Sequence, residues 1–145
     1  MEIACAAGVV YIERMLTRRH CLMLPLLLPF GATAASALEV AMQRAKAMRE
    51  AAVRAGDQPY GAVVLRGTQI VGEAPSRVIT ARNPDAHAER EAIADAQRRL
   101  GHAELTGCIL VSTSRPCRLC EAAAARARIA RMVHGDALID AGAPA

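Results

Sequence analysis

Apolar residues recur at three- and four-residue intervals from Leu38 to Ala55, which predicts an amphipathic helix that ends at Gly56. Two short apolar runs follow and flank a polar turn. They predict a hairpin of strands over 62–65 and 69–71. The apolar residues within these runs are contiguous instead of alternating with polar ones, so we expect both faces of the sheet to be covered.

Helical and extended patterns alternate along the rest of the chain. A second helix is predicted from Pro84 to Leu100, with Asn83 as its N-cap and Gly101 as its end. The remaining predicted elements are a buried strand over 108–111, a third helix that starts at Pro116 and includes 122–130, and a weak strand over 131–134. This order predicts a three-layer α/β/α sandwich, with parallel pairing of the strands on either side of the third helix.

The last segment, Gly135–Ala145, contains little that would pack against a core. The mixed sheet is therefore expected to have four strands, or five if this segment adds one.

The segment from Met15 to Ala37 has the layout of an export signal. A pair of arginines precedes an apolar run over 21–30, small residues follow, and Ala35-Ser36-Ala37 offers a cleavage site. The arginine pair resembles the twin-arginine type. The apolar run is too short to span a bilayer, and prolines interrupt it, so no membrane anchor is expected.

The expected organisation is an N-terminal extension over 1–37, with translation starting at Met15, and a mature domain over 38–145. We therefore expect a periplasmic or exported protein, or a cytoplasmic one if the signal is not used. The alternative is that 15–37 forms a buried apolar helix of the domain.

Length and composition allow one domain with a real core, since 53% of the 145 residues are hydrophobic. The formal charge of +4 is spread along the chain without a basic block, and only 2% of the residues are aromatic. A surface that stacks several nucleic-acid bases is hard to build from this composition. Nucleic acid is therefore not the expected partner.

Two short motifs carry the candidate chemistry. His87 belongs to the sequence NPDAHAER, and Cys117 and Cys120 belong to SRPCRLC. One imidazole and two thiolates are a ligand set for a catalytic Zn²⁺, which leaves its fourth position to water. The cysteines are three apart near a predicted helix start, where the helix dipole favours the thiolate that binds metal.

Glu89 lies two residues after His87, whereas chelating pairs on one helix lie three or four apart. It is better placed to contact the water on the metal than to bind the metal itself. In that position it would serve as general base and then as general acid. A His-x-Glu motif followed by Pro-Cys-x-x-Cys is the signature of zinc-dependent base deaminases.

Each motif also has a simpler interpretation. The cysteine pair alone fits a redox pair, a disulfide or a structural zinc half-site, and His-Ala-Glu occurs by chance on helices. Cys108 is expected to be a buried strand residue, His102 a solvated loop residue, and His134 a residue packed near the fourth predicted strand, over 131–134. Arg115 and Arg118 flank the cysteines and could bind an acidic group, or could be solvated.

These motifs resemble the cytidine and deoxycytidylate deaminase superfamily, specifically the branch of guanine deaminase and tRNA adenosine deaminase. The resemblance covers residues 56–135, where Asp57-Gln58-Pro59-Tyr60-Gly61-Ala62-Val63 and Asn83-Pro84-Asp85-Ala86-His87-Ala88-Glu89 match family patterns. It implies zinc ligation by His87, Cys117 and Cys120, a proton shuttle at Glu89, a mixed five-stranded sheet and a homodimer.

The expected pocket departs from the family pattern. Ser76 stands where many relatives carry a base-binding Asn, and Arg115 stands where they carry Glu. Ala125 and Arg126 replace an aromatic pair that would wall the pocket. The candidate substrate-binding residues are Tyr60, Ala62, Ser76 and Pro116.

The sequence thus predicts a zinc-dependent hydrolase with one Zn²⁺ per chain, which deaminates guanine, cytosine or adenine as a base or nucleoside. The alternatives are a tRNA adenosine deaminase and a catalytically degenerate, zinc-stabilised fold.

Overall fold

A computed structural model describes residues 34–145 of the chain. The described residues belong to one compact unit. The expected start at Met15 and the apolar run over 21–30 lie outside the described residues. No helix within residues 34–145 is both long enough and apolar enough to cross a membrane.

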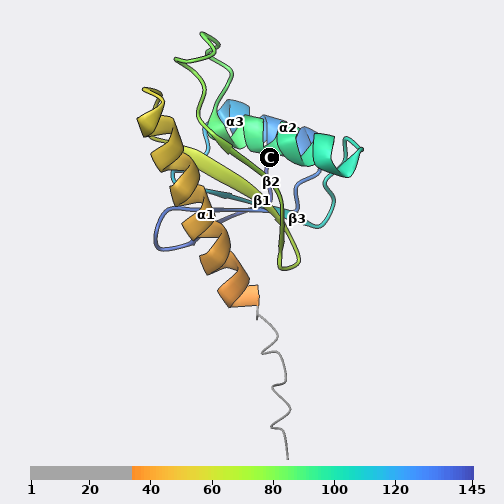
Figure 1. Ribbon diagram of the computed structural model, residues 1–145. Coiled ribbons are helices and arrows are strands. Elements are labelled where there is room, and N and C mark those ends of the chain that lie inside the picture. Colours follow the sequence, from red (N-terminus) through yellow and green to blue (C-terminus); the bar gives the residue numbers. More distant parts are fainter. Residues whose placement is uncertain (1–33) are drawn as a thin grey trace, which may run out of the picture. The chain divides into compact units, whose positions relative to one another are not determined.

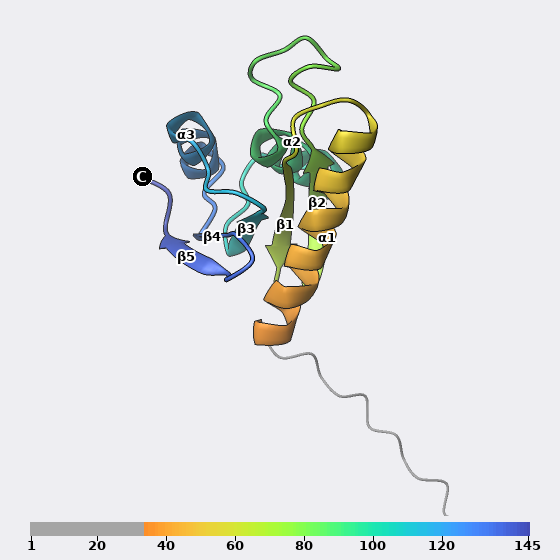
Figure 2. The same ribbon diagram turned by 90° about the vertical axis from the view of Figure 1, so that its left-hand side faces the viewer.

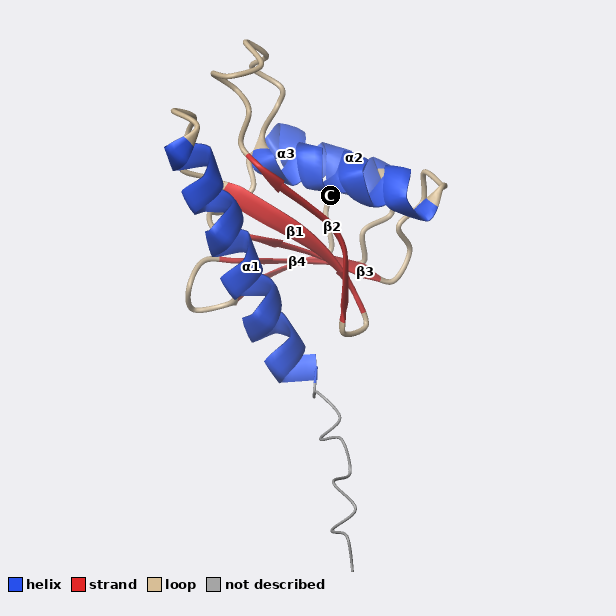
Figure 3. Cartoon of the chain, in the orientation of Figure 1, coloured by secondary structure: helices blue, strands red, loops and turns tan. Residues whose placement is uncertain are grey.

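The architecture is a mixed sheet between helices, as predicted (Figures 1 and 3), and the sheet has five strands. In chain order the elements are α1 (Ala34–Arg54), β1 (Gly61–Arg66), β2 (Gln69–Pro75), α2 (Ala88–Leu100), β3 (Cys108–Ser112), α3 (Arg118–Arg126), β4 (Arg131–His134) and β5 (Ile139–Gly142). The strand order across the sheet is β2-β1-β3-β4-β5. β3 and β4 pair in parallel, as predicted for the strands that flank α3, and the other pairs are antiparallel.

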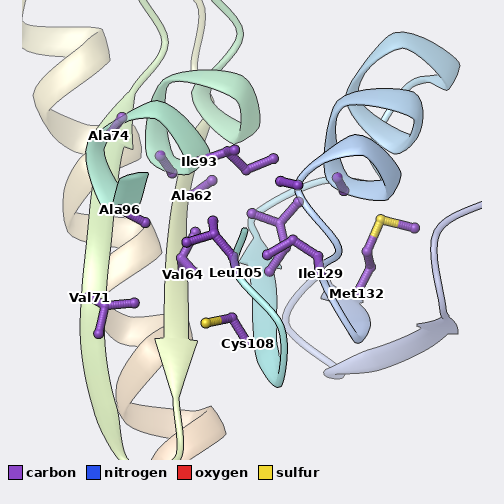
Figure 4. Close-up of a cluster of buried hydrophobic side chains, with 14 of the residues drawn as sticks. Ala62, Val64, Val71, Ala74, Ile93, Ala96, Leu105, Cys108, Ile129 and Met132 are labelled. Atoms are coloured by element: carbon purple, nitrogen blue, oxygen red, sulfur yellow. The ribbon is translucent and has the colours of Figure 1, made fainter. Parts of the chain in front are cut away.

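Both faces of the sheet are covered, which explains why the strands are apolar at consecutive positions. Ala62 and Val64 belong to a cluster with residues of α2 and α3, which Figure 4 shows. Val63 and Leu65, which alternate with them along β1, belong to a second cluster with residues of α1. Figure 2 shows α1 on one side of the strands and α2 and α3 on the other.

The helix α1 begins at Ala34, four residues before the predicted start at Leu38. Ala37 is buried in the cluster under α1. The expected cleavage point before Leu38 therefore lies within this helix.

The predicted start of the second helix at Pro84 is wrong, because α2 begins at Ala88. Asn83 closes a turn instead: its side-chain oxygen accepts the Asp85 N–H at 3.0 Å, and its carbonyl accepts the Ala86 N–H at 3.1 Å. Asn-Pro sequences favour such turns as well as helix starts. The actual N-cap is His87, with an extended backbone.

The third helix also differs from its prediction at both ends. Cys117 is its N-cap, so Pro116 precedes the helix, and the helix ends at Arg126 instead of Ala130. Arg128 has a φ of 57°, in the left-handed region that glycine usually occupies at helix ends. No glycine marks the end of this helix, so the alanine-rich pattern overestimated the length of the helix.

The fifth strand settles the choice between four and five strands. β5 pairs with β4, and all four of its residues are exposed. A strand without a buried face leaves no hydrophobic alternation, so the sequence pattern did not reveal it.

We expect Gly72→Ala to destabilise the domain. A Cβ at Gly72 would lie 2.5 Å from the Ala92 carbonyl oxygen and 2.6 Å from the Ala96 Cβ, so α2 would have to move away from β2. Such overpacking costs about 1–3 kcal/mol of unfolding free energy, which urea denaturation measures. Gln69→Ala, at the exposed start of β2, is the control. An unchanged midpoint for Gly72→Ala would contradict this close packing.

Candidate metal and active site

The sheet topology brings the two motifs to one edge. β2 and β3 are each antiparallel to β1, so they run in the same direction, and their carboxyl ends point to the same edge of the sheet. The chain then leads from β2 to α2 and from β3 to α3, so both helices begin near this edge. Open α/β sheets bind ligands at such edges.

Both helices begin with a metal-binding residue type at the N-cap. His87 and Cys117 have extended backbones, and neither side chain makes the usual capping hydrogen bond to its own helix. Their side chains are therefore free to point at each other. Cys120 lies in the first turn of α3 and is buried.

The three candidate ligand atoms form a compact triangle. His87 Nδ1 lies 3.7 Å from Cys117 Sγ and 3.5 Å from Cys120 Sγ, and the two sulfurs are 3.5 Å apart. With Zn–S bonds of about 2.3 Å and a Zn–N bond of about 2.0–2.1 Å, a tetrahedral site separates sulfur from sulfur by about 3.8 Å and sulfur from nitrogen by about 3.6 Å. The donor set and its spacing fit Zn²⁺.

Within residues 34–145 these three side chains are the one group of at least three potential ligands that could hold a metal ion. Cys108 is a buried strand residue, as predicted, and His102 is exposed. His134 is half-buried at the end of β4. Neither histidine belongs to the metal group.

Glu89 is buried beside the ligands, with 5% of its surface exposed. Its Oε2 lies 3.7 Å from Cys120 Sγ, so the carboxylate reaches the ligand group without completing it. Burial raises the pKa of this carboxyl group, while its own backbone N–H and the nearby His87 counteract the shift. A raised pKa suits a group that must both accept and return a proton near neutral pH.

Burial also raises the pKa of the Cys120 thiol, and the neighbouring Glu89 charge and Cys117 thiol add to the effect. Cys117 is exposed. Because a thiol must lose its proton to bind a metal, zinc binding here is coupled to proton release.

A cavity of about 220 Å³ adjoins the ligands. Its lining residues are Gln58, Tyr60, His87, Ala88, Glu89, Ser114, Arg115 and Cys117. It is smaller than the roughly 300–1,000 Å³ of pockets that enclose drug-sized ligands. The space suits one small group next to Glu89.

Of the four candidate substrate-binding residues, the structure places only Tyr60 in the cavity lining. Ala62 is fully buried in the core cluster with α2, and Pro116 is buried outside the lining. Ser76 is buried and donates its hydroxyl to Asp57 at 2.8 Å.

The cavity lining includes Gln58 and Ser114, which the sequence analysis did not select. Gln58 lies two residues before Tyr60, and Ser114 lies three residues before Cys117. Both residues lie in segments that carry a recognised pattern, Gln58 in Asp57–Val63 and Ser114 in SRPCRLC. Closeness in sequence to other site residues was the one signal that could have indicated them.

The buried carboxylate of Asp57 links the cavity wall to the loop that follows β2. It accepts hydrogen bonds from the Gln58 N–H and the Ser76 hydroxyl at Oδ1, and from the Ile79 N–H and the Thr80 N–H and hydroxyl at Oδ2. Burial alone would raise its pKa, but these hydrogen bonds hold the pKa well below its usual range. Asp57 thus stays ionised and fixes the wall beside Tyr60.

We expect Asp57→Asn to destabilise the protein at neutral pH, because an amide nitrogen would face hydrogen-bond donors. The depressed pKa means that the carboxylate stabilises the fold above the unfolded value of about 3.9, and that this contribution is lost as the pH falls below that value. The difference in melting temperature between wild type and variant should therefore shrink below about pH 4. Asp136→Asn, at an exposed ion pair with Lys46, is the control. A pH-independent difference would contradict the assigned role of the Asp57 charge.

Comparison with known proteins agrees with the fold and the site. The family described as "Cytidine and deoxycytidylate deaminase zinc-binding region" matches residues 35–136, and the chain belongs to this family. The predicted family resemblance is therefore confirmed.

Two relatives illustrate the match. A tRNA(Ile)-lysidine synthase of Deinococcus deserti is 40% identical over 110 residues, which are 75% of this chain and 21% of that protein. A tRNA-specific adenosine deaminase of Aquifex aeolicus is 36% identical over 96 residues, 66% of this chain and 61% of that protein. The chain thus spans less than two thirds of either protein.

The X-ray structure of guanine deaminase from Bacillus subtilis matches with a TM-score of 0.64 and 35% identity, over 67% of this chain and 62% of that one. The predicted cytidine deaminase-like sandwich is thus confirmed. The zinc-binding region of the family contains His87, Cys117 and Cys120, the residues that the structure brings together.

Proposed function

We propose that the protein is a zinc-dependent hydrolytic deaminase that replaces the exocyclic amine of a nucleobase, free or in a nucleoside, with oxygen and releases ammonia. The observation that carries this proposal is the buried Glu89 carboxylate, which lies against a three-ligand metal group at a cavity. A purely structural zinc site closes its shell with four protein ligands and needs no such carboxylate.

His87, Cys117 and Cys120 would hold the zinc ion. When bound with an open position, zinc lowers the pKa of water from 15.7 to about 7. Glu89 takes a proton from the attacking water and gives it to the ring nitrogen beside the amine-bearing carbon, while the water oxygen bonds to that carbon. Glu89 then moves the proton of the new hydroxyl to the amine, the carbon–nitrogen bond breaks and ammonia leaves.

Two features support a single base as the group that enters the site. The cavity has a volume of about 220 Å³, and Tyr60 is the one aromatic side chain that lines it within the described residues. Guanine, cytosine and adenine each carry the required amine. The choice among them depends on the wall formed by Gln58, Tyr60 and Ser114.

A tRNA adenosine is the second candidate substrate. The relative from Aquifex aeolicus is named a tRNA-specific adenosine deaminase. The chemistry at Glu89 would be the same, so this candidate differs only in what carries the base. The low aromatic content and the absence of a basic block in the sequence favour the small substrate.

The non-enzymatic alternatives make distinct predictions. A degenerate, zinc-stabilised fold would retain zinc and release no ammonia from any substrate. A redox pair would form a Cys117–Cys120 disulfide in place of a metal site. In the structure both thiols are free, with sulfurs 3.5 Å apart, whereas a disulfide bond measures about 2.05 Å.

The test of the proposal combines zinc content with ammonia release, measured on the full chain against bases, nucleosides and a tRNA transcript. One zinc per chain and ammonia from a base or nucleoside would support the proposed function. Ammonia from the tRNA alone would favour the second candidate. Zinc without ammonia from any substrate would overturn the deaminase proposal.

We also propose that the protein is exported through the twin-arginine-like segment. Cleavage before Leu38 would remove the first turn of α1, including the buried Ala37. N-terminal sequencing of the native protein reports the processing site and the true start.

We propose in addition that the protein forms a homodimer. Light scattering reports the oligomeric state, and a monomeric mass would contradict the homodimer.

A further inference from the structure

We propose that Arg115 is a specificity-determining residue that binds an anionic group on the substrate, so that the preferred substrate is a nucleoside 5′-monophosphate instead of a neutral base or nucleoside. This inference rests on the proposed deaminase function, because it assumes that a base occupies the cavity beside Glu89.

Arg115 is the one arginine that lines the cavity in the described part of the chain. Its side chain is exposed, and no hydrogen bond or ion pair links it to another residue within 34–145. Many other arginines of the domain have carboxylate partners, such as Arg44 with Glu73 and Arg131 with Asp140. Arg115 thus presents an unpaired guanidinium to the cavity.

The remaining lining side chains leave this charge unbalanced. The one acidic residue in the lining is Glu89, which is buried beside the metal ligands. Gln58, Tyr60 and Ser114 are neutral, and their side-chain polar atoms have no hydrogen-bond partner within the described residues. The cavity therefore offers one positive charge and several unused hydrogen-bonding groups to a ligand.

A phosphate group satisfies this arrangement better than a neutral substrate does. The planar guanidinium binds phosphate oxygens through two parallel charge-assisted hydrogen bonds. A free base or a nucleoside brings no anion and would leave Arg115 unpaired. A nucleoside 5′-monophosphate brings one base and one anionic group, which matches one cavity with one arginine in its lining.

The lining residues differ in burial, so the cavity has an inner end and an outer end. Glu89 is buried and Arg115 is exposed, so the cavity extends from the ligand group toward the surface. A volume of about 220 Å³ accommodates the base at the inner end. The phosphate then lies at the outer end, where a flexible arginine can meet it.

An RNA chain would use the surface differently. It presents many phosphates, and each contact with a lysine or arginine adds to the salt dependence of binding. Arg118 is also exposed and has no partner within the described residues, but it lies outside the cavity lining. An RNA substrate would engage Arg118 and Arg115 alike, whereas a mononucleotide would engage Arg115 alone. Arg118→Gln is therefore a matched control that removes the same charge three residues away.

The experiment compares the zinc-loaded full chain with Arg115→Gln and Arg118→Gln. The kcat/KM for ammonia release is measured for the 5′-monophosphates of cytidine, adenosine and guanosine and for the corresponding nucleosides. We expect the best monophosphate to exceed its nucleoside by roughly tenfold, as for hydrogen bonds to a charged group. Arg115→Gln should abolish this preference by lowering the kcat/KM for the monophosphate to the level of its nucleoside, and Arg118→Gln should retain it.

Binding to the full-length Glu89→Gln variant, measured by calorimetry, separates this inference from the proposed function. If no compound releases ammonia, the deaminase proposal fails, and tighter binding of the monophosphate that requires Arg115 would still support the anion site. Equal binding of monophosphate and nucleoside, or a preference that survives in Arg115→Gln, would overturn it. So would a single-stranded RNA that binds more tightly than any monophosphate and depends equally on both arginines.

Discussion

Replacing Glu89 by glutamine is expected to reduce ammonia release by roughly a hundred- to ten-thousand-fold, the contribution typical of a positioned general acid–base. Glutamine has nearly the same shape but cannot carry the proton from water to the ring nitrogen and the amine. Because Glu89 does not belong to the ligand group, zinc content should stay at one per chain. The measurement is kcat together with metal content for both proteins.

Glu91→Gln is the matched control for this experiment. Glu91 lies on the same helix and faces Arg77, with the closest atoms 3.9 Å apart, and it does not line the cavity. Its replacement should leave ammonia release unchanged. If Glu89→Gln retained full activity, Glu89 would not be the proton shuttle. If it lost zinc as well, the assignment of Glu89 outside the ligand set would be wrong.

Cys120→Ala is expected to remove zinc from the protein. It deletes one of three protein ligands, and changes to the partners of ligands alone already cost about 10- to 100-fold in metal affinity. Zinc in solution should then no longer raise the melting temperature, since a ligand stabilises only a protein that binds it. Metal analysis and thermal unfolding with and without added zinc measure the two effects.

Cys108→Ala is the control, because Cys108 is a buried cysteine of β3 outside the metal group. This variant should keep one zinc per chain and the zinc-dependent rise in melting temperature. Full zinc retention by Cys120→Ala would contradict the ligand assignment. Equal zinc loss in both variants would point to a general loss of structure.

The ligand group could be predicted from the sequence because its chemistry is specific. Few sites combine a His-x-Glu with a Pro-Cys-x-x-Cys, and the structure brings His87, Cys117 and Cys120 together as the pattern indicated. The alternation of helices and strands predicted the sandwich for a similar reason, since both faces of β1 bury consecutive apolar residues.

The helix starts could not be predicted because the N-cap positions serve the metal site. His87 and Cys117 are poor caps by propensity, whereas Asn83 is a good one and misled the prediction. The end of α3 depends on Arg128 in a left-handed conformation, which no sequence rule favours for arginine. In both places local preference gave way to tertiary contacts.

The substrate-binding residues were the least predictable part of the site. Ser76 occupies the position aligned with a base-binding residue, yet its hydroxyl is used by Asp57. Gln58 and Ser114 reach the cavity through loop geometry, which carries no periodic signal. Arg115 stood out only as a departure from the family pattern, and the structure places it in the cavity lining.

The most direct test of the central claim is to follow the oxygen during the reaction. The zinc-loaded full chain is incubated with the panel of bases, nucleosides and monophosphates in water labelled with heavy oxygen, and the products are analysed by mass spectrometry. The account predicts one product that carries a single solvent oxygen in place of its amine, with one ammonia released per product molecule. Failure of every compound to lose its amine, with zinc fully bound, would contradict the account.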